Sequence, residues 1–316
     1  MLSDRMPDLA SLSALAAVAE SGSIHTAARR LGITPQALSL RIQSTESRVG
    51  AALLARSPRG SQLTATGVLV NQWASAVLDA AAEMDAGLAA LRSDRAGHIR
   101  VAASLTIAEQ LLPRWIVALR GEQEQAGVPA LSIDLQATNS EAVNDLVRAG
   151  KVDVGFVEGP GRPRGLRSRT VARDRLLVVV APTHPWTRRR TPLTAAELAG
   201  TALVTREEGS GTRQALDVAL SDHGTTPPIL QLSGTASVKA AIIAGAGAGA
   251  LSSLAVSDDV ALGRLRVVPV TGLALVRQLK AVWIGPKQPP AGAVRALVEI
   301  AARVQLGSAE PRSVRG

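Results

Sequence analysis

Three features of the sequence predict a protein of the α/β class that is built in three parts. Residues 23–42 have the pattern of two helices joined by a tight turn, and one stripe of apolar residues at helical spacing follows at residues 69–91. From His98 onward, strand-like and helical segments alternate, which is typical of a parallel sheet covered by helices. We therefore expect a small amino-terminal helical domain, one long helix and a larger α/β domain.

The composition fits a globular chain of two or three domains. Its 316 residues are 46% hydrophobic and 19% charged, which is enough for a sizeable core. The formal net charge of +9 is carried mostly by arginine and suits a polyanionic partner. Solvated surface is an equally good explanation for the many arginines that lie far from the amino-terminal helices, namely Arg162, Arg164, Arg167, Arg169, Arg173, Arg175 and Arg188–Arg190.

Targeting and redox features favour a cytoplasmic location. The chain has no cysteine, which excludes disulfides, thiolate metal ligands and cysteine nucleophiles and is compatible with a reducing compartment. The apolar run from Leu9 to Ala19 follows Asp4 and Asp8, which outweigh Arg5, so the charge is wrong for a signal peptide. We interpret this run as the first helix. Because no stretch offers about 18 uninterrupted apolar residues, we expect no membrane partner.

The helix-turn-helix pattern is defined by its cap and turn residues. Ser23 can cap a short first helix, and Gly32 supplies the turn that follows it. At Thr34–Pro35, a hydroxyl accepts from the free N–H groups of a first turn while proline presets φ without wasting a donor. We therefore expect the second helix over residues 35–49, ended by Gly50.

The second helix buries Leu38 and Ile42 on one face and leaves a polar face outward. Glutamine and arginine pair bidentately with adenine and guanine edges in the major groove, and serine and threonine contact bases or phosphates. The candidate DNA-contacting residues of this block are Ser23, Thr34, Pro35, Gln36, Ser39, Leu40 and Arg41. An ordinary helical hairpin with a solvated polar face is the alternative.

Residues 53–64 predict two short strands around a basic tip, where Arg56 and Arg59 would meet phosphates. With the two helices, this block resembles the winged helix-turn-helix of the LysR-type transcriptional regulators. The residues that carry the resemblance are Ala27–Ala28, Ala37–Leu38–Ser39, Ile42, Glu46, Gly50, Leu53, Arg56, Leu63–Thr64 and Gly67. The resemblance implies sequence-specific binding to double-stranded promoter DNA by a domain over residues 1–66.

The chain departs from the family pattern at several positions. They are Leu15, Ile24 and Leu54, where the family usually has phenylalanine, Thr45 in place of leucine, Leu40 where arginine is frequent, and Pro35–Gln36, which inverts the usual order. Aliphatic residues in place of aromatic ones keep the core apolar, so the same fold is expected. The Leu40 difference leaves the base contacts and the operator sequence open.

A long helix over residues 67–95 follows the winged block. Its stripe consists of Leu69, Trp73, Val77, Ala80, Met84, Leu88 and Leu91. About 26 residues would extend for about 39 Å, too far for the small domain to cover the whole stripe. In the resembled family this linker helix pairs with its copy, which implies a homodimer or homotetramer and two DNA half-sites. Packing against the second domain of the same chain is the alternative.

Residues 96–310 are expected to form two α/β lobes. Predicted strands are 98–103, 130–137, 152–157, 176–181, 202–205, 229–232, 248–251, 266–270 and 279–283, with helices near 108–123, 141–149, 212–223, 237–244 and 291–305. We place residues 96–165 and 266–305 in the first lobe and residues 166–265 in the second. The family resemblance implies a periplasmic-binding-protein-like effector domain with a cleft between its lobes.

Hydroxyl and amide side chains follow several predicted strands of these lobes. The candidate effector-binding residues are Ser104, Leu105, Thr106, Thr138, Asn139, Ser140, Arg206, Ser210, Thr212, Arg213, Thr235 and Ser237. Free N–H groups at helix starts and the two arginines favour a small anionic metabolite. Plain helix caps are the alternative for each loop. Similar segments occur in the subgroup of regulators that sense sulfur or carbon-fixation metabolites.

Enzyme signatures are missing from the sequence. The glycines of residues 245–250 follow a helix and precede a strand, the reverse of a dinucleotide site. No Walker motif or Gly-x-Ser-x-Gly elbow occurs, and His25, His98, His184 and His223 lack metal-binding spacing. We expect no catalytic residue, metal or cofactor. A cytoplasmic solute-binding or enzymatic α/β protein with a helical domain that does not bind DNA is the alternative to a regulator.

Overall fold

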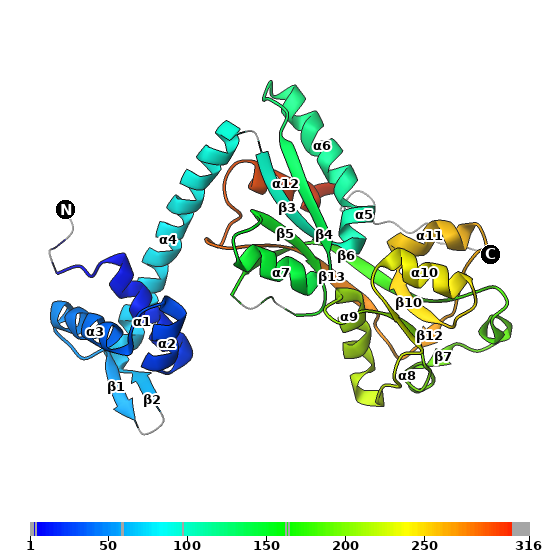
Figure 1. Cartoon of the computed structure of the whole chain (residues 1–316), viewed down its shortest axis with the longest axis horizontal. Helices are drawn as coiled ribbons and strands as arrows, with labels where there is room; N and C mark the ends of the chain where they lie inside the picture. Colours follow the sequence, from blue (N-terminus) through cyan, green and yellow to red (C-terminus); the bar gives the residue numbers. More distant parts are fainter. Residues whose placement is uncertain are drawn as a thin grey trace. The chain divides into compact units, whose positions relative to one another are not determined.

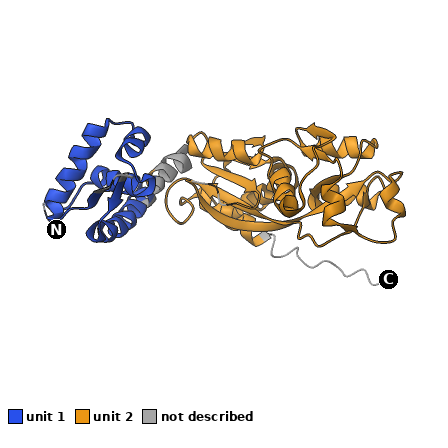
Figure 2. Ribbon diagram, turned by 90° about the horizontal axis from the view of Figure 1, so that it is seen from below, with its two compact units in different colours: residues 1–86 blue, residues 87–316 orange. Residues whose placement is uncertain are grey.

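The computed structural model describes residues 3, 5–57, 60–96, 98–161, 163 and 165–304. The chain divides into two compact units, residues 1–86 and residues 87–316, which Figure 2 shows in blue and orange. Each unit has its own hydrophobic core. We describe them one after the other.

The first unit is a winged helix-turn-helix. Its elements are α1 (Leu9–Ser21), α2 (Ile24–Leu31), α3 (Pro35–Val49), β1 (Leu54–Ser57), β2 (Gly60–Leu63) and the first part of α4 (Ala65–Ala96). The strands β1 and β2 pair antiparallel as the wing. The predicted helix over 35–49 is confirmed, and the long helix begins and ends close to its predicted bounds.

Local sequence explains where α2 and α3 begin and end. The Ser23 and Thr34 hydroxyls accept from the backbone N–H groups of Thr26 and Ala37, and so cap α2 and α3. Pro35 stands at the first position of α3. Gly50 ends the helix in the left-handed conformation that glycine adopts without a steric penalty.

Part-buried hydrogen bonds to Glu46 and a close approach at Gly67 attach the wing to the helices. One Glu46 carboxylate oxygen accepts from the backbone N–H groups of Leu53 and Leu54, at 2.7 and 3.1 Å. A Cβ atom on Gly67 would lie 2.1 Å from the Leu53 carbonyl oxygen, so only glycine lets α4 approach the wing this closely. These contacts give a physical role to Glu46 and Gly67, two residues that carry the family resemblance.

The second unit contains a nine-stranded mixed sheet, in the part of the chain that the structure describes. Its main path runs β4–β3–β5–β13–β6–β10–β8–β9, and β11 pairs with β6 off this path. Figure 1 labels β3, β4, β5, β6, β10 and β13 of this sheet. The strands are β3 (His98–Ser104), β4 (Ser132–Thr138), β5 (Val154–Glu158), β6 (Arg167–Val180), β8 (Val204–Arg206), β9 (Leu230–Leu232), β10 (Gly249–Ser252), β11 (Arg266–Val267) and β13 (Val276–Trp283). A separate pair consists of β7 (Leu193–Thr194) and β12 (Val270–Thr271).

Helices cover both faces of this sheet in each lobe. They are α5 (Leu105–Gln110), α6 (Leu112–Gln125), α7 (Ser140–Arg148), α8 (Ala195–Ala199), α9 (Gly211–Leu220), α10 (Thr235–Ile243), α11 (Ser253–Ala261) and α12 (Ala293–Val304), with short 3-10 helices at Pro185–Arg188 and Ser221–His223. In the first lobe, α5, α6 and α12 pack on one face and α7 on the other. In the second, α8 and α9 pack opposite α10 and α11.

The long strand β6 joins the two lobes. Residues 167–175 pair with β13 in the first lobe, and residues 176–179 pair with β10 in the second. The sequence predicted only its second half, because exposed arginines alternate along the first half and hide the strand pattern. A strand with a solvated face needs no apolar run.

Two further predictions about the lobes need correction. The sequence places residues 266–305 in the first lobe, but β11 pairs with Val179 and Val180 and β12 pairs with β7, so residues 266–271 belong to the second. The helices α8 and α11 were missed, since short helices that start directly after a strand give little periodic signal. Within the described residues, no helix combines the length and apolar character needed to cross a bilayer.

Candidate functional site

The first candidate site is the outward face of α3. Leu38, Ile42 and Thr45 point into the core of the first unit, and Val49 is half-buried beside them. At about 100° per residue, Leu40 lies opposite this buried row. It is 66% exposed. The helix therefore offers one continuous face that its own unit does not use for packing.

The predicted DNA-contacting residues fall on or beside this face. Thr34, Gln36, Leu40 and Arg41 are exposed, whereas Ser39 and Pro35 are half-buried. Sequence reasoning missed Gln43 and Ser44, which are exposed three and four residues after Leu40. The same helical spacing that placed Leu40 could have found them. The Arg56 side chain and the whole of Arg59 lie outside the described residues.

Asp8 carries negative charge near this face. The Ser11 backbone N–H donates to its carboxylate at 2.7 Å and is the main reason that the pKa of Asp8 is lowered. The positive charges of Arg41 and Arg48 lower this pKa further. Arg41 therefore has one ionised carboxylate in its surroundings, and its guanidinium group remains exposed.

The second candidate site lies where the two lobes of the second unit meet. Arg277 on β13 forms ion pairs with Glu158 at the end of β5 (2.9 Å) and with Asp174 on β6 (2.7 Å). All three side chains are at most 1% exposed. We call Arg277, Glu158 and Asp174 the junction triad. Two carboxylates and one guanidinium group give it a net charge of −1 when all three groups are ionised.

Hydroxyl groups from both lobes complete the triad. Thr106 on α5 and Thr212 on α9 lie 3.2 Å from the same Glu158 oxygen, and both also accept from Arg277. The Ser252 hydroxyl at the start of α11 donates to Asp174 at 3.0 Å. The triad thus places carboxylates at the positive ends of helices. Thr106 and Thr212 were predicted to bind an effector, and the structure brings them together around Glu158.

Both predicted anion-binding arginines are paired within the second lobe. Arg206 forms a bidentate pair with Glu207 and donates to Thr235 at 3.0 Å. Partial burial opposes ionisation of Glu207, but hydrogen bonds and the charge of Arg206 together lower its pKa. Arg213 donates to Asp217 and to the Thr205 hydroxyl. An anionic ligand would have to compete with these carboxylates for either guanidinium group.

Two other predicted serines are buried without a hydrogen-bonding role. Ser104 and Ser210 are each 1% exposed, and their hydroxyl groups have no hydrogen-bond partner among the described residues. They stand directly before α5 and α9, and neither side chain caps its helix. A buried unpaired hydroxyl is unfavourable unless something else bonds to it. These two hydroxyls are therefore available to a ligand that reaches them.

The remaining predicted residues have varied surroundings. Asn139 caps α7 by accepting from the Ala142 N–H at 2.9 Å, which favours the plain-cap interpretation there. Thr138 and Leu105 are half-buried, and Ser237 is exposed on α10. The backbone N–H of Glu141 donates to the Gly209 carbonyl at 3.2 Å, so the start of α7 in one lobe touches the loop before α9 in the other.

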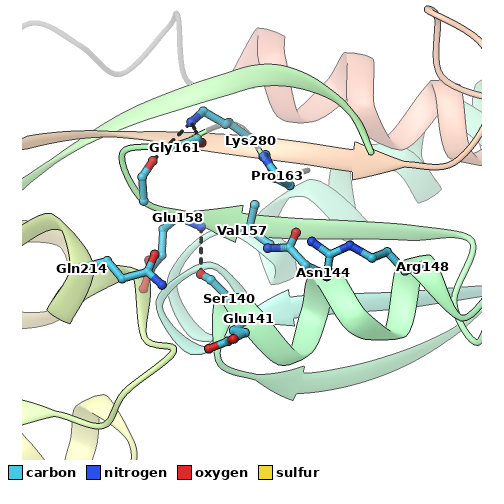
Figure 3. A pocket seen from close by; sticks show the side chains of 11 residues that line it. Ser140, Glu141, Asn144, Arg148, Val157, Glu158, Gly161, Pro163, Gln214 and Lys280 are labelled. Atoms are coloured by element: carbon cyan, nitrogen blue, oxygen red, sulfur yellow. Dashed lines mark hydrogen bonds between the residues drawn. The ribbon is translucent and has the colours of Figure 1, made fainter. Parts of the chain in front are cut away.

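A polar cavity of about 230 Å³ opens beside this contact (Figure 3). Its lining residues are Ser140, Glu141, Asn144, Arg148, Val157, Glu158, Gly159, Gly161, Pro163, Gln214 and Lys280. Lys280 is buried and donates to the Gly159 and Gly161 carbonyls, at 3.2 and 2.6 Å. The Asn144 amide oxygen is buried and has no hydrogen-bond partner among the described residues. The cavity therefore offers both donors and acceptors.

Sequence reasoning missed most residues of the junction and the cavity. Glu158 gave a usable signal, because it follows an apolar run at the carboxyl end of a predicted parallel strand, where ligands of α/β folds bind. Arg277 and Lys280 gave none. Their partners lie about one hundred residues away along the chain, and only the order of strands in the sheet brings them together.

Two family models match the chain. The model of the LysR substrate binding domain matches residues 92–305, and the model of the bacterial regulatory helix-turn-helix protein of the lysR family matches residues 9–68. The first covers most of the second unit, and the second covers the helices and the wing of the first. The residues between the two matches, 69–91, lie within α4.

Two curated proteins are similar over nearly their whole length. An uncharacterized HTH-type transcriptional regulator of Mycobacterium tuberculosis is 49% identical over 302 residues, covering 94% of this chain and 97% of that protein. The HTH-type transcriptional regulator CysL of Bacillus subtilis is 31% identical over 269 residues, covering 85% of this chain and 88% of that protein.

Two solved structures have the same fold. A full-length OxyR variant from Pseudomonas aeruginosa superposes with a TM-score of 0.54 at 20% identity, covering 93% of this chain and 98% of that chain. The regulatory domain of Synechocystis CcmR in complex with 2-PG gives 0.55 at 22% identity, covering 66% of this chain and 97% of that chain. The predicted α/β architecture with a winged amino-terminal domain and a two-lobed second domain is confirmed.

Proposed function

We infer the activity of this chain from its family, because the chain belongs to the LysR-type transcriptional regulators, which bind DNA and carry an effector-binding domain. We propose that its first unit binds specific promoter sequences and that a small metabolite bound in the second unit changes this binding. The members of this family are transcriptional regulators and not enzymes, in agreement with the sequence-based expectation of no catalytic residue. A regulator of this kind would act in the cytoplasm.

The outward face of α3 is the observation that carries the DNA-binding proposal. A rigid helix, packed through Leu38 and Ile42, presents exposed Gln36 and Arg41 for base edges and Thr34 for bases or phosphates. Ser23 and Ser39 would contribute further hydrogen bonds to the DNA. The wing, with Arg56 and Arg59, would add phosphate contacts and a salt-dependent share of the affinity.

The long helix α4 supports assembly into a homodimer or a homotetramer. Leu69, Trp73 and Met84 are 51%, 65% and 69% exposed, and Leu88 lies further along the same stripe at 45%. A row of exposed apolar side chains on a 32-residue helix is typical of a surface that pairs with a second copy. Pairing would address two half-sites about one helical turn, or a multiple of it, apart.

For the effector, a small anionic metabolite remains our proposal. The CcmR domain is described with 2-PG, and this chain places the start of α7, Arg148 and Lys280 around its polar cavity. The Ser104 and Ser210 hydroxyls, which stand directly before α5 and α9 and have no hydrogen-bond partner among the described residues, would accept from or donate to a ligand that reaches them. A ligand can shift the regulator only by binding one arrangement of the lobes more tightly than another.

Fluorescence anisotropy with labelled duplexes tests the DNA-binding part. Sequences enriched from a random duplex library by the full-length protein should bind far more tightly than a scrambled duplex, and affinity should fall steeply with salt. The variant Gln36→Ala should lose this preference, whereas Gln72→Ala, which removes an exposed glutamine from α4, should keep it. Flat salt dependence with no enriched sequence would reject the proposal.

Thermal shift with 2-PG, inorganic phosphate and inorganic sulfate tests the effector part. A ligand of the native state raises the melting temperature in proportion to the logarithm of its concentration. The increase should disappear in Ser104→Ala and in Arg148→Ala, which removes an arginine that lines the cavity. It should persist in Arg303→Ala, a surface control whose side chain pairs with Glu122. No stabilisation by any of these anions, while DNA binding persists, would remove the anionic class and leave the regulator.

A further inference from the structure

Leu40 occupies an unusual place on α3. It lies opposite the buried residues Leu38 and Ile42, two positions from each, at the centre of the outward face. Its side chain is 66% exposed. The exposed neighbours one helical turn away, Gln36 and Gln43, are both polar. A branched aliphatic group therefore stands in the middle of the surface that this helix would lay against DNA.

A leucine in that position discriminates among bases because its side chain forms no hydrogen bonds. It has no donor or acceptor, so any amino or carbonyl group of a base beneath it would lose water without gaining a partner. In the major groove, only thymine presents an apolar group, its 5-methyl. We propose that Leu40 contacts the 5-methyl group of a thymine and so selects a T·A pair at one position of each half-site.

The flanking glutamines reinforce this preference. Glutamine pairs bidentately with adenine through N6 and N7. Gln36 and Gln43 flank Leu40 along the same face, four residues before it and three after it. Three neighbouring side chains of α3 would then favour A·T pairs by two independent means, hydrogen bonding and methyl contact. This inference rests on the proposed sequence-specific binding and adds the identity of the group that Leu40 recognises.

Replacing thymine by deoxyuridine isolates the methyl group, because the two bases have the same hydrogen-bonding edges. The experiment uses full-length protein and the duplex enriched by selection, with each thymine replaced by deoxyuridine in turn. At one thymine per half-site, we expect the wild-type protein to lose roughly fourfold in affinity, the effect of one buried methyl group. Leu40→Ala should bind the thymine and deoxyuridine duplexes equally well.

Matched variants separate methyl contact from a general loss of binding. Gln43→Ala should weaken binding yet keep the fourfold response to deoxyuridine, because it leaves Leu40 in place. Leu40→Met retains an apolar side chain of similar volume and should keep most of the response. Since Leu40 is exposed, its replacement by alanine should leave the melting temperature of the protein unchanged.

Two outcomes would overturn the assignment, and they are distinguishable. If the wild-type protein binds its selected site but no deoxyuridine substitution has an effect that depends on Leu40, the methyl contact is wrong and the regulator proposal stands. If selection enriches no sequence, the methyl contact and the sequence-specific binding from which it follows both fail.

Discussion

The outward face of α3 and the junction triad are two polar regions of opposite character. On α3, the side chains proposed to contact DNA come from one continuous helix, and Gln36, Leu40 and Arg41 among them are exposed. At the junction, the polar groups are buried, and they come from strands and helices of both lobes. The first region is adapted to an external partner, while the second already satisfies much of its own charge. The exposed side chains of α3 can therefore vary without loss of fold, whereas the buried groups of the triad cannot.

The largest effect should come from Arg277→Met at the junction. This change leaves Glu158 and Asp174 buried without their cation, and breaking a buried pair in this way costs about 3–5 kcal/mol. Urea unfolding of the second unit should report the loss. Arg30→Ala, which removes an exposed ion pair with Glu20 in the first unit, is the control and should cost about 0–1 kcal/mol. Equal losses of unfolding free energy in the two variants would contradict the proposed difference between the two regions.

Asp259 tests whether other buried carboxylates of the second unit behave like the triad. Lys239, and then Arg264, hold its pKa below the ordinary value of 3.8 against the opposing effect of burial. Because the folded-state pKa is lowered, its contribution is present above pH 3.8 and is lost as the pH falls through the folded value. Asp259→Asn should cost about 1.5–3 kcal/mol at neutral pH, and less in acid.

Chemical unfolding of wild type and Asp259→Asn at a series of pH values from neutral to strongly acidic measures this dependence. The gap between the two proteins should narrow only below the ordinary pKa of the carboxyl group. A gap that stays constant as the pH falls would show that the asparagine acts through packing and not through the lost charge.

Close packing between the lobes should make Gly211→Ala the next strongest change. A Cβ atom there would lie 1.9 Å from the Glu158 carbonyl oxygen, so α9 must move away from β5. Overpacking of this kind typically costs about 1–3 kcal/mol. Gly161→Ala, at a cavity glycine whose added Cβ meets nothing within 4 Å, is the matched control. Comparable melting temperatures for the two variants would contradict the tight contact.

Arg41→Ala should have the smallest effect on stability and a clear effect on the salt dependence of DNA binding. Its side chain is exposed, so the melting temperature should not change. If Arg41 contacts a phosphate, the slope of log affinity against log salt should fall by about one. Arg303→Ala, which removes the same charge from the second unit, should leave that slope unaltered. An identical salt slope for both variants would show that Arg41 does not contact a phosphate.

The sequence predicted the first unit in near-complete detail. The bounds of α3 follow from Thr34, Pro35 and Gly50, and its outward face follows from helical spacing alone. In the second unit, the alternation of strands and helices was correct apart from the missed helices α8 and α11. The sequence did not predict the first half of β6, or the lobe to which residues 266–271 belong, because strand pairing and not local composition decides both.

What the sequence determined by itself was therefore local: helix ends, buried rows and the side chains left facing outward, since each depends on residues within a few positions. Tertiary structure alone decided the chemistry of the junction triad. Arg277 meets Asp174, 103 residues earlier in the chain, because β13 and β6 are neighbours in the sheet. The energy of a buried ion pair depends on that proximity and on exclusion of water, and neither is encoded in any short stretch of residues.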